Sequence, residues 1–240
     1  MSDDAPFRLE REMLGPLRTA LPAALELGKT SVNSVLRFVE TPSLGSVIPD
    51  ILMGVWHSNS TALLKGITYV EAVVLAFIEN AKGASLADLL STVYLTQSSA
   101  QRLVDRLIKR AVLQLDDQGR FALSPEYAPS NTELIAVEVK LRRWREALAQ
   151  AVSYSSFANR AYVVLDGAQF VVRPETLNHF RDCGVGLLLQ YGDKLNVAID
   201  ADRHEPIGHQ RFLALQQLSG SSVLSVTAAP FATPQRQQAI

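Results

Sequence analysis

The pattern of apolar and polar positions divides the chain into three stretches. Residues 7–27 carry leucines at helical spacing, and two runs rich in β-branched residues follow at 32–40 and 46–56. The segment TPSLG between these two runs predicts a β-hairpin. From 58 to 130 the apolar residues recur at helical intervals instead, and beyond 131 the alternation of a strand returns.

The middle stretch predicts three helices followed by a hairpin. Its helical patterns cover 68–81, 85–94 and 96–113, and the third is the most clearly amphipathic in the chain. Two short alternating runs then surround a turn at Asp117–Gly119. Three helices and a hairpin are the elements of a winged helix-turn-helix domain.

The last stretch begins with the strand ELIAVEVKL, 133–141. We expect a helix over 142–158, a strand over 160–166, a short helix near 174–182 and a hairpin that turns at Gly192-Asp193. Without the middle stretch, the order is helix, strand, strand, strand, helix, strand, which predicts one α/β domain interrupted by an inserted domain. The predicted parts are 1–57, the inserted 58–130, 131–218, and a tail at 219–240 whose composition allows disorder.

Two charged side chains stand on the apolar strand at 133–141. Glu138 and Lys140 share one strand face with Ala136, because successive strand residues point to opposite faces. We expect Asp50, directly after Pro49, to lie within the strand at 46–56 and to meet them at one end of the sheet. Two carboxylates can hold Mg²⁺, and an ammonium group can stabilise charge on a phosphate or orient water.

These residues resemble a nuclease motif. Pro49-Asp50, the EVK of Glu138 to Lys140, and the element order resemble the PD-(D/E)XK superfamily, whose fold is a restriction-endonuclease-like mixed sheet flanked by helices. Gln150 and Tyr154 in the following helix look like the QxxxY motif of RecB-type members. The resemblance covers about 7–57 and 131–200.

The resemblance implies a role for each matching residue. Asp50, Glu138 and the backbone carbonyl of Val139 would hold Mg²⁺ or Mn²⁺, and Lys140 would position the attacking water. Gln150 and Tyr154 would steady the site or contact the DNA backbone, and the first-helix acid Glu10 would face it. About 90 residues separate Asp50 from Glu138, so Asp50 has this role only if 58–130 is a true insertion.

The third predicted helix of the winged helix is the candidate DNA-reading element. The basic and acidic residues of 61–127 balance, but this helix carries an excess of positive charge. A major-groove helix contacts base edges and phosphates with such side chains. The candidate DNA-binding residues on this helix are Gln97, Ser98, Ser99, Gln101, Arg102, Arg106 and Lys109. Two more candidates, Arg142 and Arg143, begin the RRWRE segment that follows Lys140 and Leu141.

Composition changes this interpretation little. The 23 basic and 24 acidic residues nearly cancel, so DNA affinity must come from a local patch. The single cysteine, Cys183, excludes an intrachain disulfide and suits a cytoplasmic protein. No apolar run approaches the roughly 20 residues of a membrane span, and the acidic N-terminus does not read as a signal peptide.

Three functions are compatible with the sequence. The first is a Mg²⁺-dependent deoxyribonuclease that the winged helix positions on double-stranded DNA. The second is a non-catalytic DNA-binding or transcription-regulatory protein on a degenerate nuclease scaffold, for which a homodimer is a natural arrangement. The third is a protein-interaction subunit, because many winged helices bind proteins rather than DNA.

Overall fold

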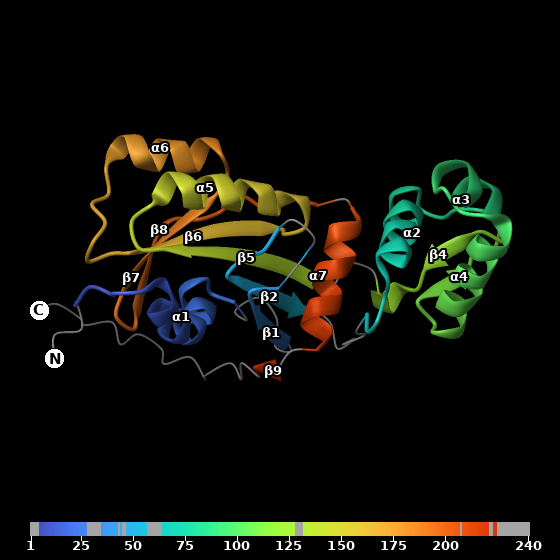
Figure 1. Cartoon of the computed structure of the whole chain (residues 1–240), viewed down its shortest axis with the longest axis horizontal. Coiled ribbons are helices and arrows are strands. Elements are labelled where there is room, and N and C mark those ends of the chain that lie inside the picture. The colour runs from blue at the N-terminus through green and yellow to red at the C-terminus, as the bar shows by residue number, and fades with distance from the viewer. Residues whose placement is uncertain are drawn as a thin grey trace, which may run out of the picture.

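The computed structural model contains a mixed sheet covered by helices, and a small helical unit with its own hairpin (Figure 1). It describes residues 5–27, 35–42, 44, 47–56, 64–127, 132–206, 208–220 and 223–224. The predicted α/β class is confirmed. In its described part, no helix is long and apolar enough to cross a membrane.

The main sheet has the strand order β8-β7-β6-β5-β2-β1-β9. Strands β5, β6 and β7 run parallel to one another, while β2 and β8 pair antiparallel with β5 and β7. The strands are β1 (Val35–Glu40), β2 (Ile51–Trp56), β5 (Thr132–Lys140), β6 (Arg160–Asp166), β7 (Gly186–Tyr191), β8 (Lys194–Ile199) and β9 (Val223–Leu224). All nine residues of β5 are buried, as its place at the centre of the sheet requires.

Helices cover both faces of this sheet. Helix α1 (Glu10–Ala24) packs its buried side chains Met13, Leu17 and Leu21 against one face. The other face is covered by α5 (Trp144–Ser153), α6 (Pro174–Asp182) and α7 (His209–Ser219). The two apolar layers follow from the alternation of β5, in which Ile135 and Val137 face α1 whereas Leu134 and Ala136 face the other helices.

The helical unit lies between β2 and β5 in the chain. It consists of α2 (Tyr69–Asn80), α3 (Leu86–Thr92), α4 (Gln97–Lys109), and the hairpin of β3 (Leu113–Leu115) and β4 (Phe121–Leu123). A short 3₁₀ helix, η1 (Pro125–Tyr127), follows. Each of the three helices begins at a capping residue, Thr68, Ser85 or Thr96, whose side chain accepts a backbone N–H bond. The predicted helices and hairpin are therefore present.

Three details differ from the sequence expectations. Asp50 lies just before β2 rather than within it. Tyr154 begins the 3₁₀ helix η3 (Tyr154–Ser156) instead of continuing the α-helix from Gln150. Helix α7 was not predicted, because its apolar residues do not form one stripe; it is covered by the sheet on one side and by α2 on another.

The tail at 219–240 is only partly covered by the structure. Within it, Val223–Leu224 pair with β1 as β9, so this short segment is part of the sheet. The remaining residues beyond Gly220, and with them the expectation of disorder, lie outside the described residues.

Candidate functional site

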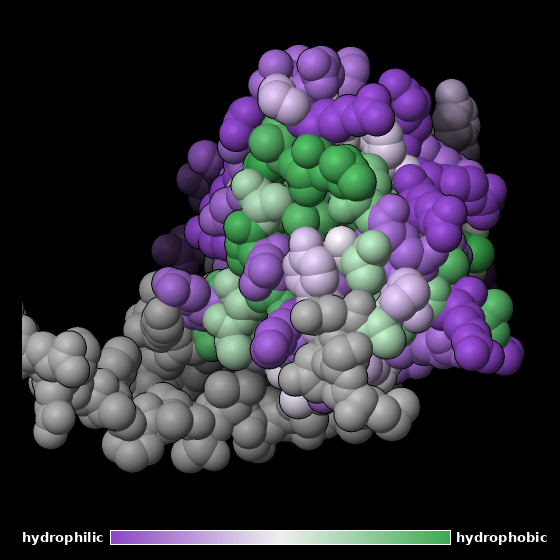
Figure 2. Space-filling model, turned by 90° about the vertical axis from the view of Figure 1, so that its left-hand side faces the viewer, coloured by the Kyte–Doolittle hydropathy of each residue, from purple (hydrophilic) through white to green (hydrophobic). Residues whose placement is uncertain are grey.

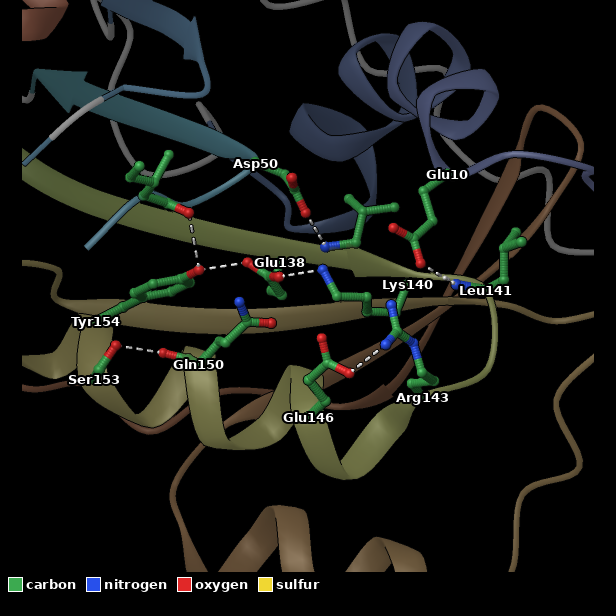
Figure 3. Close-up of polar contacts among 12 residues, drawn as sticks. Glu10, Asp50, Glu138, Lys140, Leu141, Arg143, Glu146, Gln150, Ser153 and Tyr154 are labelled. Carbon is green, nitrogen blue, oxygen red and sulfur yellow. Dashed lines mark hydrogen bonds and ion pairs between the residues drawn. The ribbon is translucent and has the colours of Figure 1, made fainter. Parts of the chain in front are cut away.

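The predicted acid and lysine residues come together at one edge of the sheet (Figure 3). The antiparallel pairing of β2 with β5 sets Ile51 opposite Val137 and so brings the preceding Asp50 beside Glu138. The backbone N–H of Val139 donates a 2.7 Å hydrogen bond to Oδ2 of Asp50. The two acids are 88 positions apart in the chain but neighbours in space.

Glu138 is held by two neighbours. Nζ of Lys140 donates a 2.5 Å hydrogen bond to Oε1 of Glu138, and the hydroxyl of Tyr154 donates to Oε2. Glu138, Lys140 and Tyr154 are all buried. The Tyr154 hydroxyl also contacts the carbonyl of Ile48 at 3.4 Å, close to Asp50 in the chain. Tyr154 therefore fixes the orientation of the Glu138 carboxylate.

Helix α1 supplies a further acid. Oε1 of Glu10 accepts a hydrogen bond of 3.3 Å from the backbone N–H of Leu141, directly after Lys140. We call Glu10, Asp50, Glu138 and Lys140 the carboxylate–lysine cluster. The sequence signal for Glu10 was its position on the same helical face as the buried leucines of α1.

Burial dominates the electrostatics of the two acids in the cluster. Burial raises the pKa of Asp50, and the Val139 hydrogen bond and the Lys140 charge offset this only in part. Burial also raises the pKa of Glu138 against the opposing effect of its hydrogen bonds with Lys140 and Tyr154. Each carboxylate is therefore harder to ionise than an exposed one, as expected for a carboxyl group removed from water.

Lys140 and Tyr154 both hold their protons firmly. Burial acts to lower the pKa of Lys140, but the hydrogen bond and charge of Glu138, with the charges of Asp50 and Glu10, outweigh it and raise the pKa. Burial and the hydrogen bond to Glu138 raise the pKa of Tyr154 as well. At neutral pH the cluster thus contains a protonated ammonium group and a neutral phenol that donates.

The residues of the cluster fit a hard divalent cation. Asp50, Glu138 and the carbonyl of Val139 would offer oxygen ligands, and Mg²⁺ commonly takes one or two carboxylates and retains several waters. Within the described residues, no three His, Cys, Asp or Glu side chains group closely enough to hold a metal by themselves. A bound cation would favour the ionised form of both acids, whose pKa burial raises.

The other predicted residues near this edge have different surroundings. Gln150 is exposed on α5, and Figure 3 shows its side chain on the side of that helix that faces the cluster. Arg142 donates to Oε1 of Gln169, and Arg143 forms a 2.8 Å ion pair with Glu146. Both arginines remain exposed beside the cluster.

The predicted DNA-reading helix is α4. Gln97, Ser98 and Arg102 are exposed on it, and Gln97 and Ser98 line a shallow hollow together with Thr96 and Gln101. Lys109 is exposed in its last turn. These side chains lie outside the apolar stripe with which α4 packs onto its neighbours.

Three predicted DNA-binding residues of α4 have partners within the protein. Nε of Arg106 donates a 2.9 Å hydrogen bond to the buried Glu71 of α2, and Gln101 donates to Asp105. Ser99 accepts a 2.9 Å hydrogen bond from the capping hydroxyl of Thr96. Arg106 therefore anchors α4 to α2, a role that the helical spacing did not indicate because the partner lies 35 residues away.

Comparison with known proteins identifies the class of the helical unit. A model of the MarR family matches residues 65–120, which span α2 to the end of the β3–β4 turn. The three helices and hairpin of the matched residues are thus similar to the winged helix of the MarR family. The match does not extend to the main sheet.

The remaining comparisons add no argument. No curated protein matches the chain. A solved structure of a protein of unknown function from Silicibacter pomeroyi is 16% identical, with a TM-score of 0.27. That alignment covers 47% of this chain and 75% of the other.

Proposed function

We propose that the protein binds double-stranded DNA through the winged helix at 65–120. The observation that carries this proposal is the MarR-family match, since such winged helices are typical of DNA-binding transcription regulators. The exposed Gln97, Ser98 and Arg102 of α4 have the chemistry to contact base edges and phosphates. A homodimer would place two such helices on neighbouring half-sites of a duplex.

Fluorescence anisotropy with labelled duplexes over a range of salt concentrations tests this proposal. We expect binding that weakens as salt rises, because arginines and lysines displace counterions from phosphates. Random and palindromic duplexes would separate general from half-site binding. A wild-type protein without salt-dependent duplex binding would contradict the proposal and favour the protein-interaction alternative.

The carboxylate–lysine cluster favours a second function, the metal-dependent hydrolysis of phosphodiester bonds. The order α1, β1, β2, β5, α5, β6 and the positions of Asp50, Glu138 and Lys140 support a PD-(D/E)XK nuclease domain. In this interpretation, 58–130 is a domain inserted between two paired strands, β2 and β5. The inserted winged helix would hold DNA while the cluster cuts it.

The roles of the cluster residues follow from their contacts. Asp50, Glu138 and the Val139 carbonyl would hold Mg²⁺ or Mn²⁺, which when bound neutralises charge and acidifies water. Lys140, kept protonated and oriented by Glu138, would stabilise negative charge that develops on the phosphate. Tyr154 keeps the Glu138 carboxylate in one orientation, and Gln150, on the side of α5 that faces the cluster, would contact the DNA backbone.

Incubation with plasmid and linear DNA, with and without Mg²⁺ or Mn²⁺, tests the second function. We expect cleavage by wild type and a loss of about 100-fold or more in Lys140→Ala, the size typical for one group that stabilises transition-state charge. The exposed Lys82→Ala is the matched control. Equal background from wild type and Lys140→Ala would leave a non-catalytic DNA-binding regulator.

A further inference from the structure

The loop from Gly167 to Arg173 connects β6 to α6, and the polar groups at its start form hydrogen bonds within the protein. The buried carboxylate of Asp166 accepts 2.9 Å hydrogen bonds from the backbone N–H groups of Phe7 and Ala168. The side-chain N–H group of Gln169 donates to Asp166 and, at 2.7 Å, to the carbonyl of Phe7. These bonds fix the start of the loop against the N-terminal segment.

The same loop has one strongly exposed apolar side chain between two partly exposed ones. Val171 is 76% exposed, whereas its neighbours Phe170 and Val172 are partly buried and pack against the core. Figure 2 shows hydrophobic side chains gathered on the face of the molecule that carries this loop, beside hydrophilic ones. Surface loops usually expose polar side chains. A loop that is held by hydrogen bonds and exposes apolar side chains therefore indicates a binding surface.

This apolar loop lies at the same end of the sheet as the carboxylate–lysine cluster. Lys140 and Leu165 are partners in the parallel pairing of β5 and β6, so both strands end at the same edge. Arg142, two residues after Lys140, donates a 2.8 Å hydrogen bond to Gln169 within the loop. The loop and the cluster therefore lie at the same end of the sheet.

Arginines flank the apolar side chains. Arg142 is bonded to the loop, Arg173 ends it, and Arg8 follows the Phe7 that Gln169 holds; all three arginines are exposed. The nearby exposed acids are Glu12, whose carboxylate accepts the Arg8 backbone N–H bond, and Glu175 in the first turn of α6. The loop therefore combines apolar contacts with three exposed positive charges.

We propose that this loop, with Arg8, Arg142 and Arg173, binds a single-stranded segment of DNA beside the cluster; this rests on the proposed function. A single strand exposes apolar base faces together with its phosphates, whereas a duplex hides the base faces. The apolar part consists of three side chains, far fewer than the roughly 20 residues a side of a stable protein interface. The substrate class is thus DNA with an unpaired end or gap.

Binding of a labelled 20-nucleotide single strand in EDTA, where metal-dependent cleavage is blocked, tests the proposal. We expect Val171→Ser and Arg173→Ala each to lower single-strand affinity about fivefold, within the range for loss of one base contact. The exposed Val197→Ser and Arg203→Ala are matched controls, and Arg173→Lys should retain binding. Val171→Ser should not lower the melting temperature, since its side chain is exposed.

A labelled duplex measured alongside separates this proposal from winged-helix binding. Both loop variants should bind duplex as wild type does, whereas Arg102→Ala should lose duplex affinity. Wild type that binds duplex but no single strand would overturn the loop proposal and leave the proposed function standing. The proposal would also be overturned if Val171→Ser and Arg173→Ala bound the single strand as tightly as their controls. A change of oligomeric state in Val171→Ser without a change in DNA affinity would overturn it as well.

Discussion

The carboxylate of Asp50 accepts a 2.7 Å hydrogen bond from the backbone N–H of Val139, across 89 positions of the chain. This bond joins the segment before β2 to the end of β5 and sets Asp50 beside Glu138. It also turns a pair of short sequence motifs into one site. The cluster that results can be tested as a metal site, and its buried groups make stability depend on pH.

The hydroxyl of Tyr154 should matter for the site and little for the fold. Tyr154→Phe keeps the buried ring but removes the hydrogen bond to Glu138. We expect Mn²⁺ affinity, measured by isothermal titration calorimetry, and cleavage to fall about tenfold, as for groups that orient a metal ligand.

Tyr162→Phe is the matched control for that prediction. Its hydroxyl also donates to a carboxylate, that of Asp200, but Tyr162 faces the α1 side of the sheet. Burial raises the pKa of Tyr162 to about 12, so it too is a neutral donor. An equal loss of Mn²⁺ affinity in both variants would show that the Tyr154 contact has no special role.

Asp50 should make stability depend on pH. Because its pKa is raised in the folded protein, the folded state holds this proton more tightly than the unfolded state. The stabilisation is present below the unfolded value near 3.8 and is lost as pH rises through the folded value. Melting temperatures from pH 4 to 7 without divalent ions should therefore fall less steeply for Asp50→Asn than for wild type.

The exposed Asp182→Asn controls for the loss of one negative charge in that measurement. Added Mg²⁺ should raise the melting temperature of wild type at pH 7 more than that of Asp50→Asn, because a ligand stabilises the state that binds it. A pH profile of Asp50→Asn that parallels wild type would contradict the argument.

Replacing two arginines of α4 should have different effects, one on DNA binding and the other on stability. Arg102→Ala should weaken duplex binding about tenfold and reduce the slope of log affinity against log salt by about one phosphate contact. Arg106→Ala should instead lower the free energy of unfolding by about 1 kcal/mol, since it leaves the buried Glu71 without its closest cation. Anisotropy and urea unfolding measure the two effects, and a pure binding defect in Arg106→Ala would refute this assignment.

Asn159 should be essential for the position of α7. Its side-chain oxygen accepts hydrogen bonds from the backbone N–H of Leu134 and from the buried Arg211 of α7, and its side-chain N–H group donates to the carbonyl of His204. Asn159→Ala should lower the free energy of unfolding by about 2 to 4 kcal/mol, since several buried groups lose their partners.

The exposed Asn178→Ala, from α6, is the matched control for Asn159 in urea unfolding. It removes an amide of the same size whose only described bond is to the side chain of Arg181. Equal unfolding free energies for Asn159→Ala and Asn178→Ala would show that the buried bonds contribute little.

The elements with a clear periodicity were predictable. Strand β5 and helix α4 follow from local alternation and from one apolar stripe, and the winged helix from three capped helices before a hairpin. Helix α7 was not predictable in this way, because the sheet and α2 cover different sides of it and its apolar residues form no single stripe. Its position depends on Arg211, whose partners lie 52 and 79 positions away.

The same distinction between local pattern and distant contact holds for the candidate site. Local periodicity alone sets Glu138 and Lys140 on one strand face and exposes Arg102 on its helix, so these candidate residues could be chosen from the sequence. The contacts between distant segments could not be chosen in this way: Asp50 lies beside Glu138, Tyr154 donates to Glu138, and Arg106 pairs with Glu71. Local periodicity fixes the direction of a side chain, whereas its partner depends on strand pairing and helix packing between distant parts of the chain.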